Sequence, residues 1–241
     1  MILVILASGM GTRLNKKIPK CLVSINNKTL LERIVNISNE FDKVIIVGGY
    51  KINLIKKIIK NQHRKKIYLI NNKDYKTTNM VESFFKTYNK INQDVIITYS
   101  DIVFDQSLFK KMINFNKNHL LLKSNWKQIW LLRMSKKKLK LDAEDIKIKK
   151  NNIISIGTKI EKKLPKYQFM GLIRINYKNL KKVKMFYTKI KNKKVDFTNF
   201  INLLIKNNIL KFKFKETKKY WFEIDNKKDL LVAKKFFQKN K

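Results

Sequence analysis

Short apolar runs alternate, along the first half of the chain, with segments whose apolar residues recur at helical spacing. The run Ile2–Leu6 is apolar at every position, which is typical of a strand buried on both faces. The segment Thr29–Ile37 places its large apolar residues on one helical face, and Thr29 is a suitable N-cap. The same alternation predicts strands at Lys43–Val47, Ile67–Ile70 and Asp94–Tyr99, and helices at Ile52–Ile59, Met80–Tyr88 and Leu108–Phe115.

This order of strands and helices predicts βαβ crossovers, and therefore a parallel sheet in an α/β fold. In such sheets, ligands bind outside the carboxyl ends of the strands. Four predicted loops lie at these ends, so we expect them to share one crevice. They are Gly9–Gly11, Gly48–Tyr50, Asp74–Asn79 and the loop that begins at Asp101.

The second half of the chain has a different pattern. Ile146–Lys149 and Ile153–Ile156 alternate around Asn151-Asn152, which predicts a β-hairpin with the asparagine pair in its turn. Because no linker or low-complexity tract interrupts the chain, we expect a single domain, residues 1–241, in which residues 120–170 form an antiparallel insertion covering the crevice. The remaining strands are predicted at Phe169–Ile175, Phe212–Phe214 and Tyr220–Ile224, and the remaining helices at Phe197–Ile205 and Lys227–Phe237.

Composition bounds the class of protein without naming it. The 241 residues, 44% of them hydrophobic, suffice for a core without disulfides, and the single Cys21 fits a reducing compartment. No signal-peptide pattern or membrane-length apolar stretch is present, so we expect a cytoplasmic protein without a membrane span. The formal net charge is +39, but the lysines are spread over the whole length of the chain. This spread favours a general enrichment in lysine over a specific surface for nucleic acid.

The first strand leads into a loop with the chemistry of a phosphate site. Gly9 and Gly11 allow a tight turn and a close backbone approach, so that amides can face phosphate oxygens. Arg13 offers a planar fork to such oxygens, and Lys20, behind Pro19, offers a point charge. The alternative is an ordinary strand-to-helix turn. Two glycines alone would not distinguish such a turn from a phosphate-binding loop.

The loop and several later blocks resemble one family. The stretch from Leu6 through Gly9, Gly11 and Arg13 to Lys20 is similar to the signature of nucleotidyltransferases, and the whole chain is similar to the phosphocholine cytidylyltransferase-like branch. Further matching blocks are Thr78–Ser83, Ile97–Asp105, Asp142–Glu144, Ile156-Gly157, Met170–Ile173, Trp221–Asn226 and Asp229-Leu230. The resemblance implies a Rossmann-like three-layer αβα sandwich with a mixed, mostly parallel sheet, and it implies CTP as donor and Mg²⁺ as the ion.

The resemblance also assigns the metal ligands. Asp101 matches the aspartate at the end of the central strand, and Asp225 matches the second ligand of the family. A pair of carboxylates with substrate phosphates is a common magnesium site. The alternatives are structural: Asp101 as a helix N-cap before Gln106 or as a solvated loop acid, and Asp225 as the N-cap of the helix from Lys227.

The remaining site residues follow from the same reasoning. We expect Lys20, Arg13 and Asp101 to be catalytic, and Asn79 to be either a contact of the base or simply a helix cap. The expected nucleotide-binding residues are Leu6, Ala7, Ser8, Gly9, Met10, Gly11, Thr12, Arg13, Lys20, Asn79, Ser83 and Tyr99.

Aromatic and acidic residues of the second half suit an ammonium-bearing acceptor. Arg133, placed in an apolar strand, and Lys159 are candidates for the acceptor's phosphate, whereas Ser124 stands where the branch commonly has an aspartate. For any single aromatic residue, the core is the alternative. The expected acceptor-binding residues are Trp126, Trp130, Arg133, Asp142, Glu144, Lys159, Tyr167 and Glu223, and Tyr220 and Trp221 are further aromatic candidates.

The predicted activity is transfer of CMP from CTP to a phosphorylated or phosphonate small molecule, with release of pyrophosphate. The product would be a CDP-activated head group for a cell-surface glycan or lipid, and a homodimer is a family-level expectation. Phosphocholine, 2-aminoethylphosphonate, other aminoalkyl phosphates and phosphorylated amino acids stay open as acceptors. The alternatives are a sugar-1-phosphate nucleotidyltransferase and a basic nucleic-acid-binding protein without catalysis.

Overall fold

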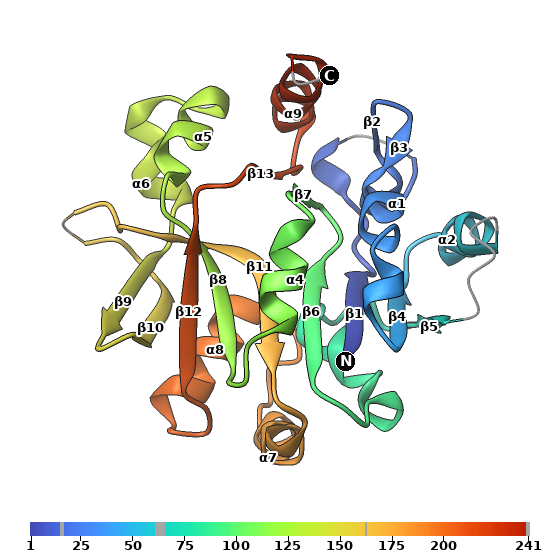
Figure 1. Ribbon diagram of the computed structural model, residues 1–241, viewed down its shortest axis with the longest axis vertical. Helices are drawn as coiled ribbons and strands as arrows, with labels where there is room; N and C mark the ends of the chain where they lie inside the picture. The colour runs from blue at the N-terminus through green and yellow to red at the C-terminus, as the bar shows by residue number, and fades with distance from the viewer. Residues whose placement is uncertain (15–16, 61–65, 162, 240–241) are drawn as a thin grey trace.

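The computed structural model describes residues 1–14, 17–60, 66–161 and 163–239 (Figure 1). Nine strands form one sheet in the order β5-β4-β1-β6-β11-β8-β12-β10-β9. The strands of this sheet are β1 (Ile2–Ala7), β4 (Lys43–Gly48), β5 (Ile67–Asn71), β6 (Val95–Tyr99), β8 (His119–Lys123), β9 (Asp145–Lys149), β10 (Asn152–Thr158), β11 (Gln168–Ile175) and β12 (Phe212–Thr217).

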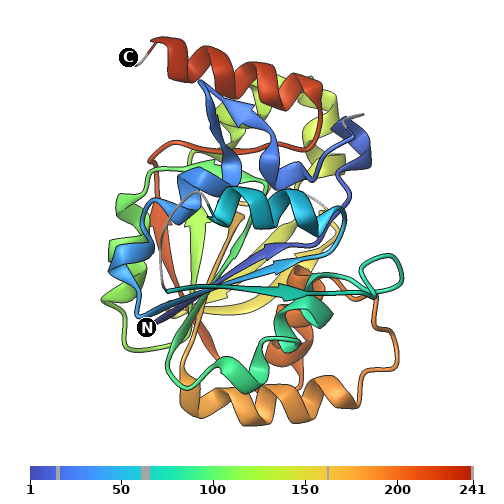
Figure 2. The same ribbon diagram turned by 90° about the vertical axis from the view of Figure 1, so that its right-hand side faces the viewer.

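Helices cover both faces of this sheet (Figures 1 and 2). The α-helices are α1 (Leu30–Val35), α2 (Ile52–Lys60), α3 (Met80–Phe85), α4 (Ser107–Ile113), α5 (Trp126–Arg133), α6 (Leu139–Asp142), α7 (Tyr177–Thr188), α8 (Phe197–Lys206) and α9 (Lys227–Lys239). Two short ribbons complete the described structure: β2 (Ser24–Ile25) with β3 (Lys28–Thr29), and β7 (Ile102–Phe104) with β13 (Trp221–Glu223).

The all-apolar strand β1 explains why the fold has three layers. Ile2, Val4 and Leu6 point into one core with α3, α7 and α8, whereas Leu3 and Ile5 point into another with α1, α2, α4 and α5. Successive side chains of a strand face opposite sides, so a run without polar residues requires cover on both. The predicted αβα sandwich with a mixed, mostly parallel sheet is confirmed.

The strand directions place many loops at one edge of the sheet. The pairings make β10 and β11 the two strands of this nine-stranded sheet that run against the others. The loops after β1, β4, β5, β6, β8 and β12 therefore leave from the same side, as predicted for the crevice. The N-cap at Thr29 is also confirmed, since Thr29 and Glu32 form a reciprocal capping box.

Three local predictions need correction. The hairpin turn is Lys150-Asn151, both with positive φ, because Asn152 already pairs with Lys149 as the first residue of β10. The helix predicted to end at Tyr88 ends as an α-helix at Phe85, and a 3-10 turn follows at Tyr88–Lys90. Residues 120–170 do not form a separate antiparallel insertion, because most of β8 and all of β9 and β10 belong to the main sheet. The two helices of this segment, α5 and α6, are not part of that sheet. That this segment covers the crevice stays a prediction.

Candidate active site

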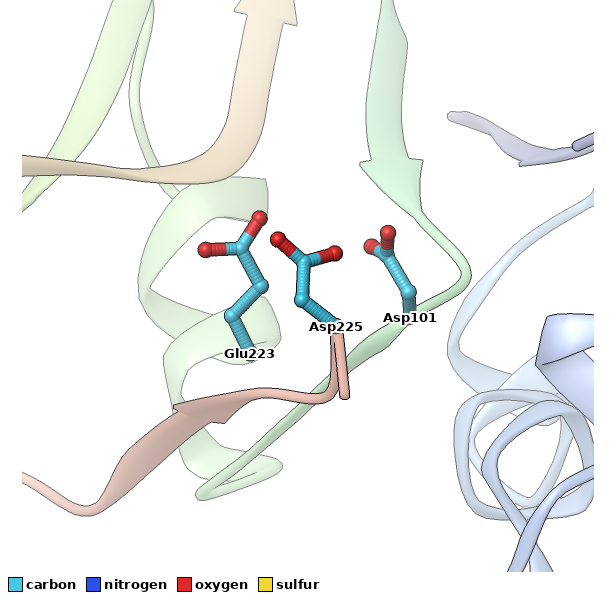
Figure 3. Close-up of side chains that lie close together, drawn as sticks. All are labelled: Asp101, Glu223 and Asp225. Atoms are coloured by element: carbon cyan, nitrogen blue, oxygen red, sulfur yellow. The ribbon is translucent and has the colours of Figure 1, made fainter. Parts of the chain in front are cut away.

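The ribbon of β7 and β13 brings three acidic side chains together. Glu223 pairs with Ile102 in this ribbon, and the Ile224 amide donates to the Asp101 carbonyl at 2.9 Å. Asp101, Glu223 and Asp225 each offer a carboxylate oxygen within 4.8 Å of the others. Figure 3 shows the three carboxylates side by side, with Asp101 coming from the segment after β6 and the other two from the end of the chain.

Two cations from the first loop face this acid cluster. The Lys20 ammonium contacts Asp101 Oδ2 at 2.6 Å and also donates to Asp225 Oδ1. Arg13 Nη1 lies 3.1 Å from Asp225 Oδ2, while most of the Arg13 side chain is exposed. The loop predicted to hold phosphates and the acids predicted to hold a metal therefore form one charged site.

Burial and mutual repulsion shape the charges of this site. Burial, together with the nearby Asp225 and Asp101, raises the pKa of Glu223 to about 8. Burial acts to lower the pKa of Lys20, but Asp101 and Asp225 outweigh it, so the pKa of this lysine is raised. Lys20 thus stays a cation, and a proton or another cation must offset the remaining negative charge of the cluster.

The acid cluster fits a hard divalent cation. Its donors are all carboxylate oxygens, which Mg²⁺ prefers over nitrogen or sulfur. Asp101 Oδ1 is buried and accepts no hydrogen bond from the described residues, so a ligand atom stands ready at this position. Glu223, predicted at the acceptor, belongs to this cluster as well as to the neighbouring cavity.

The helix-cap alternatives for the two aspartates do not hold. Asn226, rather than Asp225, accepts the amides of Lys228 and Asp229 at the start of α9. At the start of α4, Asp105 accepts the Ser107 amide at 2.9 Å, and Asp101 takes no part. The carboxylates of Asp101 and Asp225 are therefore not used as helix caps.

A cavity of about 100 Å³ lies on the nucleotide side of the acids. It contains Lys20 and Asp101, and six of the other predicted nucleotide-binding residues line it: Leu6, Ser8, Gly9, Asn79, Ser83 and Tyr99. Ala7, Met10, Gly11, Thr12 and Arg13 do not line it. Asn79 lines the cavity and accepts the Met80 amide as the N-cap of α3, so its role as a helix cap is confirmed and its contact with the base stays a prediction.

Gly11 shows why this loop needs glycine. Its φ is +64°, a region that side chains rarely adopt, and an added Cβ would lie 2.8 Å from Lys20 Cβ. The small residue lets Lys20 pass close to the loop on its way to the acids. At Gly9 an added Cβ would meet no atom within 4 Å.

A second cavity, of about 210 Å³, lies on the other side of the acids. The rings of Trp130 and Trp221 stack there with centroids 5.3 Å apart. Trp130 Nε1 donates to Asp142 Oδ2 at 2.6 Å, which fixes this carboxylate beside the rings. Burial, with Asp196 and Asp142 nearby, raises the pKa of Glu144 to about 7. Aromatic faces and acids in one cavity suit a cationic ligand.

Four predicted acceptor residues do not line this second cavity. Trp126 is completely buried and donates to the Pro165 carbonyl, as expected for a core residue. Tyr167 lies in the core beside Phe214, and Lys159 is exposed beyond the end of β10. None of these three therefore faces the cavity that Trp130 and Trp221 line.

The strand predicted at Arg133 is wrong, and its contact with the acceptor's phosphate stays a prediction. Arg133 ends helix α5 rather than lying in a strand. Its guanidinium contacts Asp142 at 2.8 Å and Asp229 at 3.5 Å and lies over the Trp130 ring. With two acids and a ring already around it, Arg133 supports the wall of the cavity instead of offering a free cation.

Several site residues escaped sequence reasoning. Asn72 lines the nucleotide cavity, and Gln168 and Phe169 line the acceptor cavity. Tyr75 and Thr78 also line the nucleotide cavity, and they belong to the loop Asp74–Asn79 that was predicted at the crevice. Asn72 directly follows a strand at the carboxyl edge, which is a usable signal. Gln168 and Phe169 carry no such signal, because packing between distant segments brings them to the acceptor cavity.

Comparison with known proteins finds similarity over almost the whole chain. The family model described as "Domain of unknown function (DUF6564)" matches residues 16–141. A "CTP:phosphoglutamine cytidylyltransferase" from Campylobacter jejuni is 32% identical over 95% of this chain and 97% of its own length. Relatedness therefore extends over both halves of the chain.

Solved structures agree with the fold. The CTP:phosphocholine cytidylyltransferase from Streptococcus pneumoniae has a TM-score of 0.77 at 18% identity, with coverage of 98% of this chain and 99% of that one. The inositol-1-phosphate CTP transferase from T. maritima has a TM-score of 0.76 at 18% identity, covering 97% and 95%. At this identity the likeness establishes the shared architecture. Among the described helices, none has the length and apolarity needed to cross a membrane.

Proposed function

The chain belongs to the nucleotidyltransferase family, in the group that the DUF6564 model describes, and from this premise we propose that it transfers CMP from CTP to a phosphate oxygen of a small, ammonium-bearing acceptor. Pyrophosphate is the other product. Use of the CDP-linked product in decorating a cell-surface glycan or lipid stays a prediction.

One observation carries the proposal: two cavities meet at one acid cluster. Asp101 and Lys20 line the nucleotide cavity, Glu223 and Asp225 line the acceptor cavity, and Tyr99 lines both. A donor in the first cavity and an acceptor in the second would meet beside the carboxylates. This is the arrangement that an in-line displacement at the α-phosphorus of CTP requires.

The residues of the chain have distinct tasks in this reaction. An acceptor phosphate oxygen is already anionic, so it attacks the α-phosphorus without a strong base, and the bond to the pyrophosphate oxygen breaks. Lys20 and Arg13 neutralise charge on the phosphates, and the walls of the two cavities orient the reactants. Asp101 and Asp225, with Glu223 beside them, would hold Mg²⁺, which supplies further neutralisation of phosphate charge when bound.

Phosphoglutamine is the first acceptor to test. It is the acceptor in the name of the relative that is 32% identical, and it carries an ammonium group as phosphocholine carries a quaternary one. Trp130 and Trp221 line the acceptor cavity, and Asp142 and Glu144 offer acids to such a group. Ser124, which replaces a common acid of the branch, donates to the Thr217 carbonyl and does not line the cavity.

A screen of pyrophosphate release tests the proposal. CTP, UTP, ATP and GTP are each combined with phosphoglutamine, phosphocholine, 2-aminoethylphosphonate and glucose 1-phosphate in the presence of Mg²⁺. We expect release with CTP and an ammonium-bearing acceptor, and its loss when EDTA removes the metal. Release only with glucose 1-phosphate would instead identify a sugar nucleotidyltransferase. No release in any combination, together with tight and salt-sensitive RNA binding, would support the nucleic-acid alternative.

A further inference from the structure

A chain of buried hydrogen bonds forms part of the wall of the nucleotide cavity. Asn72 Nδ2 donates to Ser83 Oγ at 3.0 Å, Ser83 donates to Ser8 Oγ at 3.2 Å, and Ser8 donates to the Val47 carbonyl at 3.1 Å. Asn72, Ser83 and Ser8 are all at least nine-tenths buried, and all three line the cavity. The chain links the ends of β4, β5 and β1 to helix α3.

Both ends of this chain fix the direction of its hydrogen bonds. The Asp74 amide donates to Asn72 Oδ1 at 3.1 Å, so the other branch of this side chain must be the NH₂ group. At the other end, the Val47 carbonyl can only accept. Between an obligatory donor and an obligatory acceptor, the two serine protons point the same way, from Ser83 to Ser8 and from Ser8 to Val47.

As a consequence, this part of the cavity wall can accept hydrogen bonds from a ligand but cannot donate them through its serines. A serine hydroxyl has one proton and two lone pairs. Ser83 donates its proton to Ser8, and Ser8 donates its proton to the Val47 carbonyl. Each serine oxygen uses one lone pair as an acceptor, Ser83 from Asn72 and Ser8 from Ser83. Each oxygen keeps a second lone pair, so what these two residues can offer to a ligand is an acceptor.

The two parts of the cavity orient a nucleotide. Lys20 and Asp101 make one part charged and suited to phosphates, whereas Asn72, Thr78 and Ser83 make another part neutral. A nucleotide whose phosphates contact Lys20 therefore has its base at the neutral part. The bases of CTP and UTP have almost the same size, but position 4 of cytosine is an amine donor and that of uracil is a carbonyl acceptor.

We propose that the chain from Asn72 through Ser83 and Ser8 to Val47 selects CTP over UTP by presenting acceptors to the 4-amino group of cytosine. This inference rests on the proposed function, since it assigns the base to that cavity. Asn72 acts as a positioning residue, because it directs the Ser83 proton away from the base. Uracil would place its carbonyl oxygen against serine lone pairs and leave both sides without a donor, which is costly in a buried site.

The decisive variants are Ser83→Ala and the double variant Ser83→Ala/Asn72→Leu. Loss of the Ser83 oxygen removes an acceptor. It also frees one N–H of Asn72 to donate to the O4 atom of uracil, while the Asn72 amide group keeps its hydrogen bond to Thr78 Oγ1 at 3.3 Å. The single variant should therefore lose more selectivity than the double variant, in which this donor is also absent. Ser155→Ala is the matched control, because Ser155 is a buried serine in β10 that does not line the nucleotide cavity.

The readout is the ratio of dissociation constants for UTP and CTP, measured by calorimetry without any acceptor. This ratio does not depend on the fraction of folded protein or on the identity of the acceptor. We expect wild type and Ser155→Ala to favour CTP by at least about tenfold, and Ser83→Ala to lose about tenfold of that preference or more. The double variant should lie between them.

An unchanged ratio in Ser83→Ala would overturn the inference, as would equal losses in the single and double variants. A wild type that binds CTP and UTP equally well, yet releases pyrophosphate with an acceptor, would contradict this inference alone. A wild type that binds neither nucleotide would contradict the proposed function together with the inference.

Discussion

The two sides of the site are built in different ways. The nucleotide side comes from loops that follow β1, β5 and β6, all within the first 101 residues, and each begins where a predicted strand ends. The acceptor side is assembled from α5, the end of α6 and the segment after it, β11, α8 and β13, which lie far apart in the sequence. The first is specified by local backbone conformation and the second by packing between distant segments.

Their electrostatics differ as well. The nucleotide side contains Lys20, which offsets the charge of Asp101 and Asp225. The acceptor side gathers Asp142, Glu144, Glu223 and Asp225 around one cavity, in a chain whose formal net charge is +39. An excess of acids in so basic a protein favours a cationic ligand on this side, and variants can separate the two contributions.

The largest effect is expected where the two sides meet. Lys20 lines the nucleotide cavity but also contacts Asp225, which lines the acceptor cavity. Lys20→Ala should lower kcat by about 10²–10³, the scale for loss of one group that stabilises the transition state. Lys110→Ala, which removes a largely exposed lysine of α4, is the control in the same steady-state assay. A near-normal kcat in Lys20→Ala would contradict the role of this lysine in the reaction.

An intermediate effect is expected from Glu144, which belongs to the acceptor side alone. Glu144→Gln should raise KM for an ammonium-bearing acceptor by about tenfold, through loss of a charged partner, and leave KM for CTP unchanged. Equal increases in both KM values would contradict the separation of the two sides.

The same residue gives the acceptor side a pH dependence. Because its pKa is raised to about 7, Glu144 loses its negative charge as the pH falls below that value. The other acids facing it in the structure, Asp142 and Asp196, favour this protonation. Acceptor KM should therefore rise as the pH falls from 8 to 6 in wild type and rise less in Glu144→Gln. Dividing the two profiles cancels the titration of the acceptor's own phosphate, and parallel profiles would refute the assignment.

The smallest effect concerns the backbone of the first loop. Gly11→Ala forces a side chain into a left-handed conformation against Lys20, so it should lower the free energy of unfolding by about 1–2 kcal/mol. Gly9→Ala is the matched control, with an expected change below about 0.5 kcal/mol, since its added Cβ meets no atom. Urea denaturation measures both values. Equal losses would show that the loop does not depend on the conformation of Gly11.

The sequence predicts those features that depend on neighbouring residues. The unbroken apolar run of β1 required cover on both faces, and the structure has it. Thr29 and Glu32 are spaced for a capping box, and they form one. The aspartates after β6 and β13 were expected to meet across the crevice, and the β7–β13 ribbon brings them together.

The features that the sequence does not predict depend on long-range packing. Arg133 follows an apolar stretch that fits a strand or a helix, and contacts with α9 and α6 accompany its helical state. Nothing near Trp126 or Tyr167 tells that their rings enter the core, whereas Trp130 stacks on Trp221 from the far end of the chain. The direction of the hydrogen bonds through Ser83 depends on Asn72 and Val47, which no local pattern connects.

Identification of the reaction product tests the central claim most directly, because the two cavities are proposed to meet at the α-phosphorus of CTP. Wild type is incubated with CTP, phosphoglutamine and Mg²⁺, and the products are analysed by mass spectrometry and ³¹P NMR. The account predicts pyrophosphate and a compound in which a new diphosphate bond joins CMP to the acceptor. Formation of CDP and inorganic phosphate, with the acceptor unchanged, would contradict it.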